Sequence, residues 1–137
     1  MIKYLVQNPE HLHKLHWRKF EELLDALFKN LGYRTELGPG TGDEGVDLRL
    51  YQKDDIGEIL TLVQAKKYDP KNPITLEPVQ ALSGILDVEN AQRGLFVTTS
   101  RYLPVAKRFA DKVGRKLVLA DTKDIVRWCK DSINKGY

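Results

Sequence analysis

The stretch that decides the fold runs from residue 46 to residue 66 and reads VDLRLYQKDDIGEILTLVQAK. Residues 46–53 alternate apolar and polar side chains, a pattern typical of a strand with one buried face. Residues 54–57 (DDIG) are typical of a turn, and residues 58–66 carry apolar side chains on both faces, as a strand in the middle of a sheet does. The stretch therefore predicts an antiparallel hairpin whose second strand is central.

The chain before this hairpin predicts one long helix followed by a strand at residues 33–37. Asn8 is suited to cap the helix, Pro9 to form its first turn, and Gly32 to end it. Apolar residues then recur at three- and four-residue spacing, which places them on one face of that helix. They are Trp17, Phe20, Leu23, Leu24, Leu27, Phe28 and Leu31.

Helices and strands alternate after the hairpin. We expect helices at residues 76–88 and 103–113, strands at 94–99 and 116–119, and a last helix capped by Asp121 or Thr122. Strands joined through helices run parallel, whereas the two strands of a hairpin run antiparallel. The order αβββαβαβα therefore predicts an α/β fold of three layers, in which a mixed sheet of roughly five strands is flanked by helices.

Composition limits the classes of protein to which the chain can belong. With 137 residues, 42% apolar and 30% charged, it fits a single domain, and its net charge of +3 permits attraction to phosphate. The one cysteine, Cys129, excludes a disulfide framework and a four-thiolate zinc site and favours a reducing, cytoplasmic setting. The apolar runs are shorter than the roughly 20 residues of a membrane helix, so we expect no membrane partner. We expect His11, His13 and His16 on the surface and not in a zinc site.

Four polar residues interrupt this otherwise ordinary pattern. Asp47 begins the first hairpin strand, Gln64 and Lys66 end the second, and Glu21 lies on the long helix. Gln64 and Lys66 are two residues apart, so both point to the same face of a strand that is otherwise apolar, where unpaired polar groups are costly. Because the start of one antiparallel strand lies near the end of the other, Asp47 is expected beside them.

Such a cluster suits the hydrolysis of a phosphodiester. Hard oxygen ligands hold magnesium, and a lysine orients or deprotonates the attacking water. The glycine-rich segment 38–45 lets a phosphate backbone approach closely, although it fits neither a P-loop nor a dinucleotide fingerprint. Between the two neighbouring carboxylates, helical phase favours Glu21, because Glu22 points away from the apolar stripe.

Four motifs in this order resemble those of an Mrr-type restriction endonuclease domain in the PD-(D/E)xK nuclease superfamily. They are Phe20-Glu21, GDEGVD (residues 42–47), Gln64-Ala65-Lys66 and GLFVTTS (residues 94–100), and the resemblance covers residues 17–121. It implies a restriction-endonuclease-like fold and magnesium-dependent cleavage of DNA that leaves a 5′-phosphate, with manganese as a substitute metal.

The resemblance also implies roles for individual residues. It makes Asp47 a metal ligand, Lys66 the catalytic lysine, Glu21 the helix carboxylate, and the carbonyl of Ala65 a further metal ligand. Gln64 stands where most of the superfamily has Asp or Glu, whereas the Mrr-like branch often has Gln. A neutral amide oxygen is a weaker cation ligand than a carboxylate, so one metal ion and two both remain open.

Candidate DNA contacts surround this cluster: Gly42, Asp43, Gly45, Lys67 and Ser100. Asp43 and Glu44 can equally be solvated acids of a turn, and Ser100 can instead cap the helix that follows it, which we favour. Further basic residues could form a wider rim that faces the phosphates of DNA. The alternative is an ordinary solvated surface of mixed charge. The members of this rim would be Lys67, Lys71, Arg101, Lys107, Arg108 and Lys112.

The predicted function is therefore a metal-dependent DNA endonuclease. Two alternatives remain: a structure-specific nuclease acting on branched DNA as a dimer, and a DNA-binding module of the same fold that has lost catalysis. Mrr-type proteins usually join such a domain to a separate recognition domain. We therefore expect DNA as the partner, together with a homodimer or a separate recognition subunit, and the sequence specificity cannot be read from the chain.

Overall fold

The described residues, 2–40 and 45–135 of a computed structural model, contain a five-stranded sheet in the order β1-β2-β3-β4-β5. Its strands are β1 (Arg34–Leu37), β2 (Leu48–Lys53), β3 (Glu58–Lys66), β4 (Arg93–Thr98) and β5 (Leu117–Ala120). The β1/β2 and β2/β3 pairs are antiparallel, and the β3/β4 and β4/β5 pairs are parallel. The predicted mixed sheet is confirmed, with β3 at its centre.

The hairpin follows from its turn and its register. The Asp54 side chain accepts hydrogen bonds from the backbone N–H groups of Ile56 and Gly57, at 2.9 and 3.0 Å. Leu48 pairs with Val63 at the other end of the hairpin. The alternation in residues 46–53 therefore sets which side chains of β2 face inward, and the turn sets the register with β3.

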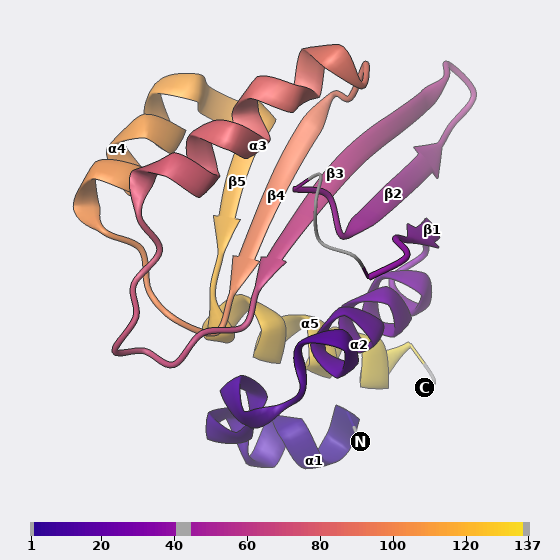
Figure 1. Ribbon diagram of the computed structural model, residues 1–137. Coiled ribbons are helices and arrows are strands. Elements are labelled where there is room, and N and C mark those ends of the chain that lie inside the picture. The colour runs from indigo at the N-terminus through magenta and orange to yellow at the C-terminus, as the bar shows by residue number, and fades with distance from the viewer. Residues whose placement is uncertain (1, 41–44, 136–137) are drawn as a thin grey trace.

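Helices cover both faces of the sheet (Figure 1). One face is covered by α2 (Trp17–Asn30) and α5 (Thr122–Asn134), and the other by α3 (Leu76–Val88) and α4 (Pro104–Val113). The central strands bury alternate side chains on the two sides. Val63, Leu95 and Val97 belong to the core under α2 and α5, whereas Leu62 and Phe96 belong to the core under α3 and α4. Burial on both faces explains why β3 reads as continuously apolar.

The prediction of one long helix from Asn8 is wrong. A separate helix, α1 (Ile2–Gln7), precedes it, and Pro9–Lys14 forms only a 3-10 helix. The backbone is then extended at Leu15 and His16, and α2 begins at Trp17 with the His16 ring accepting from the Arg18 N–H. Leu5 from α1, Leu12 from the 3-10 helix and Phe20 from α2 nevertheless belong to one core.

The remaining elements match the expected order with boundary shifts of one or two residues. Gly32 has a φ of +103° just after α2, so it ends that helix as predicted. Asp121 caps α5 by accepting from the Lys123 N–H, and Asp124 reaches back to the Asp121 N–H. In the described part of the chain, no helix is both long and apolar enough to cross a membrane.

Candidate active site

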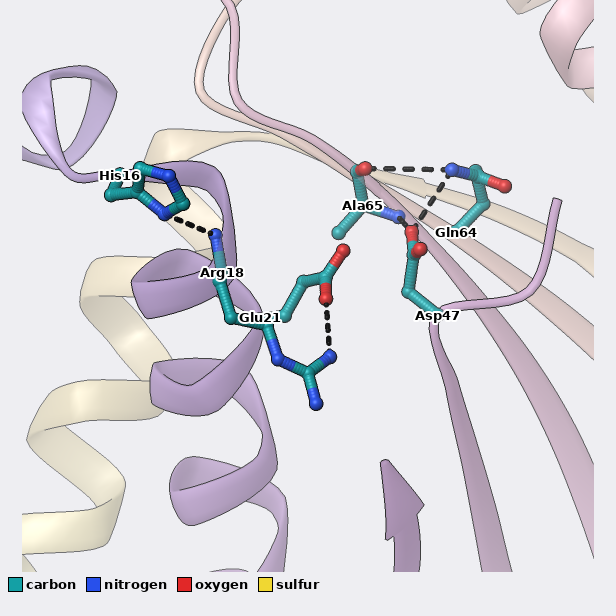
Figure 2. Close-up of polar contacts among 6 residues, drawn as sticks. All are labelled: His16, Arg18, Glu21, Asp47, Gln64 and Ala65. Carbon is teal, nitrogen blue, oxygen red and sulfur yellow. Dashed lines mark hydrogen bonds and ion pairs between the residues drawn. The ribbon is translucent and has the colours of Figure 1, made fainter. Parts of the chain in front are cut away.

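Asp47 lies immediately before β2 and is fixed from both its backbone and its side chain. Its N–H donates to the Val63 carbonyl at 2.8 Å, which extends the ladder by one step beyond the strand. Its Oδ2 accepts from the Ala65 N–H at 2.7 Å and from the Gln64 amide at 2.9 Å (Figure 2). With only 8% of its surface exposed, Asp47 is a buried carboxylate oriented by two donors.

Glu21 reaches the same place from α2. Its carboxyl points toward Asp47 (Figure 2), and 7% of the residue is exposed. The Arg18 guanidinium donates to Glu21 Oε1 at 2.9 Å. By contrast, Glu22 pairs with Lys19 at 3.4 Å at the exposed side of the helix. The structure therefore places Glu21, and not Glu22, beside Asp47, as helical phase predicted.

The charge of Glu21 is disfavoured in the fold. Burial raises the pKa of its carboxyl, and the neighbouring Asp47 raises that pKa further through its charge and a shared hydrogen bond. The ion pair with Arg18 opposes the rise without cancelling it. The Arg18 guanidinium pairs with Glu21, whereas Asp47 is held by the neutral donors Ala65 N–H and Gln64.

The end of β3 supplies the polar groups that the sequence predicted. Continuing the register from Leu48 opposite Val63 puts Gln64 opposite Asp47 on one face. Gln64 is 7% exposed, and its Oε1 lies so close to Gly45 that a Cβ there would be 3.3 Å from it. The carbonyl of Lys66 accepts from the Thr98 hydroxyl at 2.8 Å, which ties the end of β3 to β4.

A cleft of about 280 Å³ opens onto these groups. Its lining residues are Trp17, Glu21, Gly40, Asp47, Gln64, Ala65, Lys66, Lys67 and Tyr68. All four residues predicted to carry the chemistry, and the Ala65 whose carbonyl was predicted to bind metal, therefore share one cavity. Glu21 on α2 and Lys66 at the end of β3 are 45 residues apart in the chain, and both line this cavity.

The donors in this cleft fit a hard divalent cation. Carboxylate, amide and carbonyl oxygens are the ligands that Mg²⁺ takes in proteins, and a cation would relieve the repulsion between Glu21 and Asp47. Within residues 2–40 and 45–135, no group of three or more His, Cys, Asp or Glu side chains can hold a metal. Gln64 and Ala65 also line the cleft, so an amide oxygen and a backbone carbonyl are available there beside the two carboxylates.

The candidate DNA contacts differ in where the structure puts them. Gly42, Asp43 and Glu44 lie outside the described residues. Lys67 lines the cleft, and its ammonium donates to the His13 carbonyl at 3.2 Å. Ser100 does not cap the next helix: Leu103 holds that position, and the Ser100 hydroxyl donates to the Asn72 carbonyl at 2.7 Å.

The predicted basic rim is largely absent from the cleft. Of its six members, only Lys67 lines the cavity in the described part of the chain. Lys107, Arg108 and Lys112 lie on α4, which packs against α3 and β5 on the opposite face of the sheet from α2.

Sequence reasoning missed three residues of this site. Trp17 was assigned to the apolar stripe, which is wrong, because 45% of it is exposed and it lines the cleft. Tyr68, two residues after Lys66, is 40% exposed and lines the cleft as well. Arg18 was overlooked as the partner of Glu21. Spacing was the available signal, because residues three and four positions before Glu21 share its side of a helix.

Comparisons with known proteins identify the family of the chain. The restriction endonuclease family model of the Mrr catalytic type matches residues 12–129. The type IV methyl-directed restriction enzyme EcoKMrr of Escherichia coli (strain K12) is 34% identical over 113 residues, which cover 79% of this chain and 36% of that protein. The chain thus spans about a third of the length of the curated relatives it matches.

Solved structures share the fold. The DNA modification-dependent restriction endonuclease AspBHI matches with a TM-score of 0.72 at 23% identity, covering 98% of this chain and 36% of that one. MspJI restriction endonuclease, solved in complex with a 27-mer oligonucleotide, matches with a TM-score of 0.70 at 20% identity, covering 98% and 32%. The predicted restriction-endonuclease-like fold is confirmed, and the chain belongs to the Mrr-type restriction endonuclease family.

Proposed function

We propose that this chain is the nuclease domain of a metal-dependent DNA endonuclease, with Mg²⁺ as its ion and Mn²⁺ as a substitute. The observation that carries the proposal is the buried pair of Glu21 and Asp47, which shares one cleft with Lys66. Placing two carboxylates together in a buried site is unfavourable, and a metal ion between them would lower this cost, which supports a metal site here. A bound divalent ion would stabilise negative charge on the phosphate as the phosphodiester is cut.

Four groups of the chain would hold the ion. Asp47 is pre-oriented, because the Ala65 N–H and the Gln64 amide fix one of its oxygens. Glu21 approaches from α2, where Arg18 balances its charge until the ion binds. The Ala65 carbonyl would add a third oxygen. Gln64 would add its Oε1 once its amide group turns, because in the fold its amide nitrogen donates to Asp47 Oδ2 at 2.9 Å and to the Ala65 carbonyl at 3.4 Å. Holding Asp47 in place before the metal arrives reduces the reorganisation needed for catalysis.

Lys66 acts on the attacking water. Its position at the end of β3 is held by the hydrogen bond between its carbonyl and Thr98, so its side chain projects into the cleft from a rigid strand. The Lys66 amine would orient the water and accept its proton. As the water oxygen bonds to phosphorus, the bond between phosphorus and the 3′ oxygen would break, which leaves a 3′-hydroxyl on one end and the phosphate on the 5′ end of the other. A positioned proton-transfer group typically contributes about 100- to 10,000-fold to the rate.

The choice of DNA site rests on parts beyond this cleft. The relatives are about three times as long as the matched region, and the name of the E. coli relative describes it as methyl-directed. We propose that recognition depends on a second copy of the chain or on a separate recognition module, and that Lys67 and Gly45 contact the DNA backbone at the cleft.

A cleavage assay tests the proposal. Purified protein is incubated with supercoiled plasmid, branched DNA and single strands in Mg²⁺, Mn²⁺ or EDTA. The parent should cut in the presence of either metal and not in EDTA, and Lys66→Ala should lose about 100-fold or more of the rate. Lys53→Ala is the matched control, because Lys53 is an exposed lysine at the opposite end of the hairpin. Equal cutting by both variants, or cutting in EDTA, would refute the assignment.

A further inference from the structure

Two aromatic side chains border the cleft without being buried in it. Trp17 is 45% exposed and Tyr68 is 40% exposed, and both line the cavity that holds Glu21, Asp47 and Lys66. Phe20 and Phe96, in contrast, are 1% and 0% exposed. Exposed aromatics also occur singly elsewhere, as at Tyr4, which is 53% exposed, but Trp17 and Tyr68 are distinguished by lining one polar cleft together, where their faces are open to a ligand.

Both rings are held on well-anchored backbone. Trp17 is the first residue of α2, one turn before Glu21, so the two side chains share one side of the helix. The His16 ring lies against the Trp17 ring, with centroids 5.3 Å apart. The Tyr68 carbonyl accepts from the Thr99 hydroxyl at 2.7 Å, two residues after the end of β3. The aromatic faces are therefore presented from two separate elements to one cavity.

Their neighbours complete the chemistry of a site for a nucleic acid strand. Lys66 and Lys67 line the same cleft, so cationic groups suited to phosphate lie beside aromatic faces suited to bases. Proteins that bind single strands combine these two kinds of group, because every base has a π-face on which an aromatic ring can stack. In a duplex those faces are covered by the neighbouring base pairs.

We propose that Trp17 and Tyr68 are substrate-positioning residues that stack on unpaired bases next to the phosphodiester that is cut. This inference rests on the proposed nuclease function and deepens it: the substrate class is DNA with unpaired nucleotides at the cleavage point. The cleft, of about 280 Å³, is open between the two rings and the two lysines, so a strand could pass its bases over the rings and its phosphates past Lys66 and Lys67.

Binding without cleavage tests the inference. Lys66→Ala protein is used in EDTA, with Trp128→Phe added so that Trp17 is the one tryptophan left of the two in the chain. A single strand should quench the Trp17 fluorescence and bind more tightly than its matched duplex at the same salt concentration. A duplex that binds as tightly as the strand and quenches as strongly would overturn the inference.

Substitutions separate stacking from a structural role. Trp17→Ala and Tyr68→Ala, each made in Lys66→Ala protein, should weaken single-strand binding by about 5- to 150-fold per ring and leave duplex binding nearly unchanged. Trp17→Phe and Tyr68→Phe should retain most of the affinity, because a ring remains. Tyr4→Ala is the control, since Tyr4 is a 53% exposed aromatic on α1 that does not line the cleft. Circular dichroism confirms that each variant folds.

The outcomes distinguish this inference from the proposed function. If the parent cuts plasmid but the two alanine variants bind single strands as well as Lys66→Ala does, the stacking inference fails and the nuclease stands. If the parent cuts no DNA but the alanine variants lose single-strand affinity and the phenylalanine variants keep it, the stacking inference stands and the nuclease fails. Absence of any single-strand binding overturns the stacking inference.

Discussion

Replacing Glu21 with Gln isolates the electrostatics of the site. The amide has the size of the carboxylic acid and can still accept a hydrogen bond from Arg18, but it carries no charge. Burial and the nearby Asp47 raise the pKa of the Glu21 carboxyl above its ordinary value of 4.5. A carboxyl whose pKa is raised by folding contributes stability below its unfolded pKa, and that stability is lost as the pH rises through its folded pKa.

The expected magnitude follows from linkage. A single proton changes the free energy of unfolding by at most about 1.4 kcal/mol per pH unit, and only between the unfolded and the folded pKa. Without metal, Glu21→Gln and the parent should therefore have the same free energy of unfolding at low pH. As the pH rises above 4.5, the variant should become more stable than the parent. Once the pH exceeds the folded pKa, the difference should stay constant.

Urea unfolding in EDTA, from about pH 4 to about pH 8, measures this difference. Glu22→Gln is the control, since Glu22 is the adjacent and exposed carboxylate, and its difference from the parent should vary little with pH. A Glu21→Gln difference that stays flat, or that favours the parent as the pH rises, would refute the electrostatic reasoning.

Adding Mg²⁺ should reverse the order of stability, so that the parent becomes more stable than Glu21→Gln. A ligand that binds only the folded state stabilises it by about 2.7 kcal/mol when present at about 100 times its dissociation constant. Mg²⁺ should give this gain to the parent and a much smaller one to Glu21→Gln at the same concentration. Equal gains in the two proteins would show that Glu21 is not a ligand.

The remaining predictions concern the second carboxylate and the loop before it. Gln64→Glu replaces the donor that holds Asp47 Oδ2 with a third acid. It should therefore lower the free energy of unfolding in EDTA by about 1–3 kcal/mol and increase the stabilisation that Mg²⁺ gives. Urea unfolding measures both effects. A loss that Mg²⁺ does not recover would contradict the role given to Gln64. Gly45→Ala should cost about 1–2 kcal/mol and slow plasmid cleavage, because Gly45 has a φ of +74° and a Cβ would lie 3.3 Å from Gln64 Oε1. Gly57→Ala, where a Cβ meets nothing within 4 Å, is the control, and equal effects of the two alanines would refute this account.

Local patterns predicted most of the fold. The alternation in residues 46–53 and the turn at Asp54 were enough to place β2 beside β3, since both signals depend only on neighbouring residues. The N-terminal region was predicted wrongly for the opposite reason. Asn8 and Pro9 are good local signals for a helix start, but only a 3-10 helix follows them, and the backbone is extended at His16 before α2 begins. Leu12 and Phe20 pack in one core across this break, a tertiary arrangement that the local signals do not show.

The site was predictable to the extent that it follows from register and helical phase. Asp47 faces Gln64 because of the hairpin register, and Glu21 is selected over Glu22 because of its position on α2. Trp17 was misassigned, because the helical period that identifies core positions cannot show where the sheet beneath the helix ends. That end is where the cleft takes the place of the core.

The sequence by itself determined the order of the elements from α2 onward, the hairpin that pairs Asp47 with Gln64, and the family resemblance carried by four short motifs. These depend on interactions between residues near one another in the chain or on residue identity alone. Only the tertiary structure decided that Glu21 and Asp47 are buried together and that Trp17 and Tyr68 stay exposed at the cleft. Burial and repulsion between like charges depend on segments that packing brings together. The pattern of residues along the chain does not show where those segments meet.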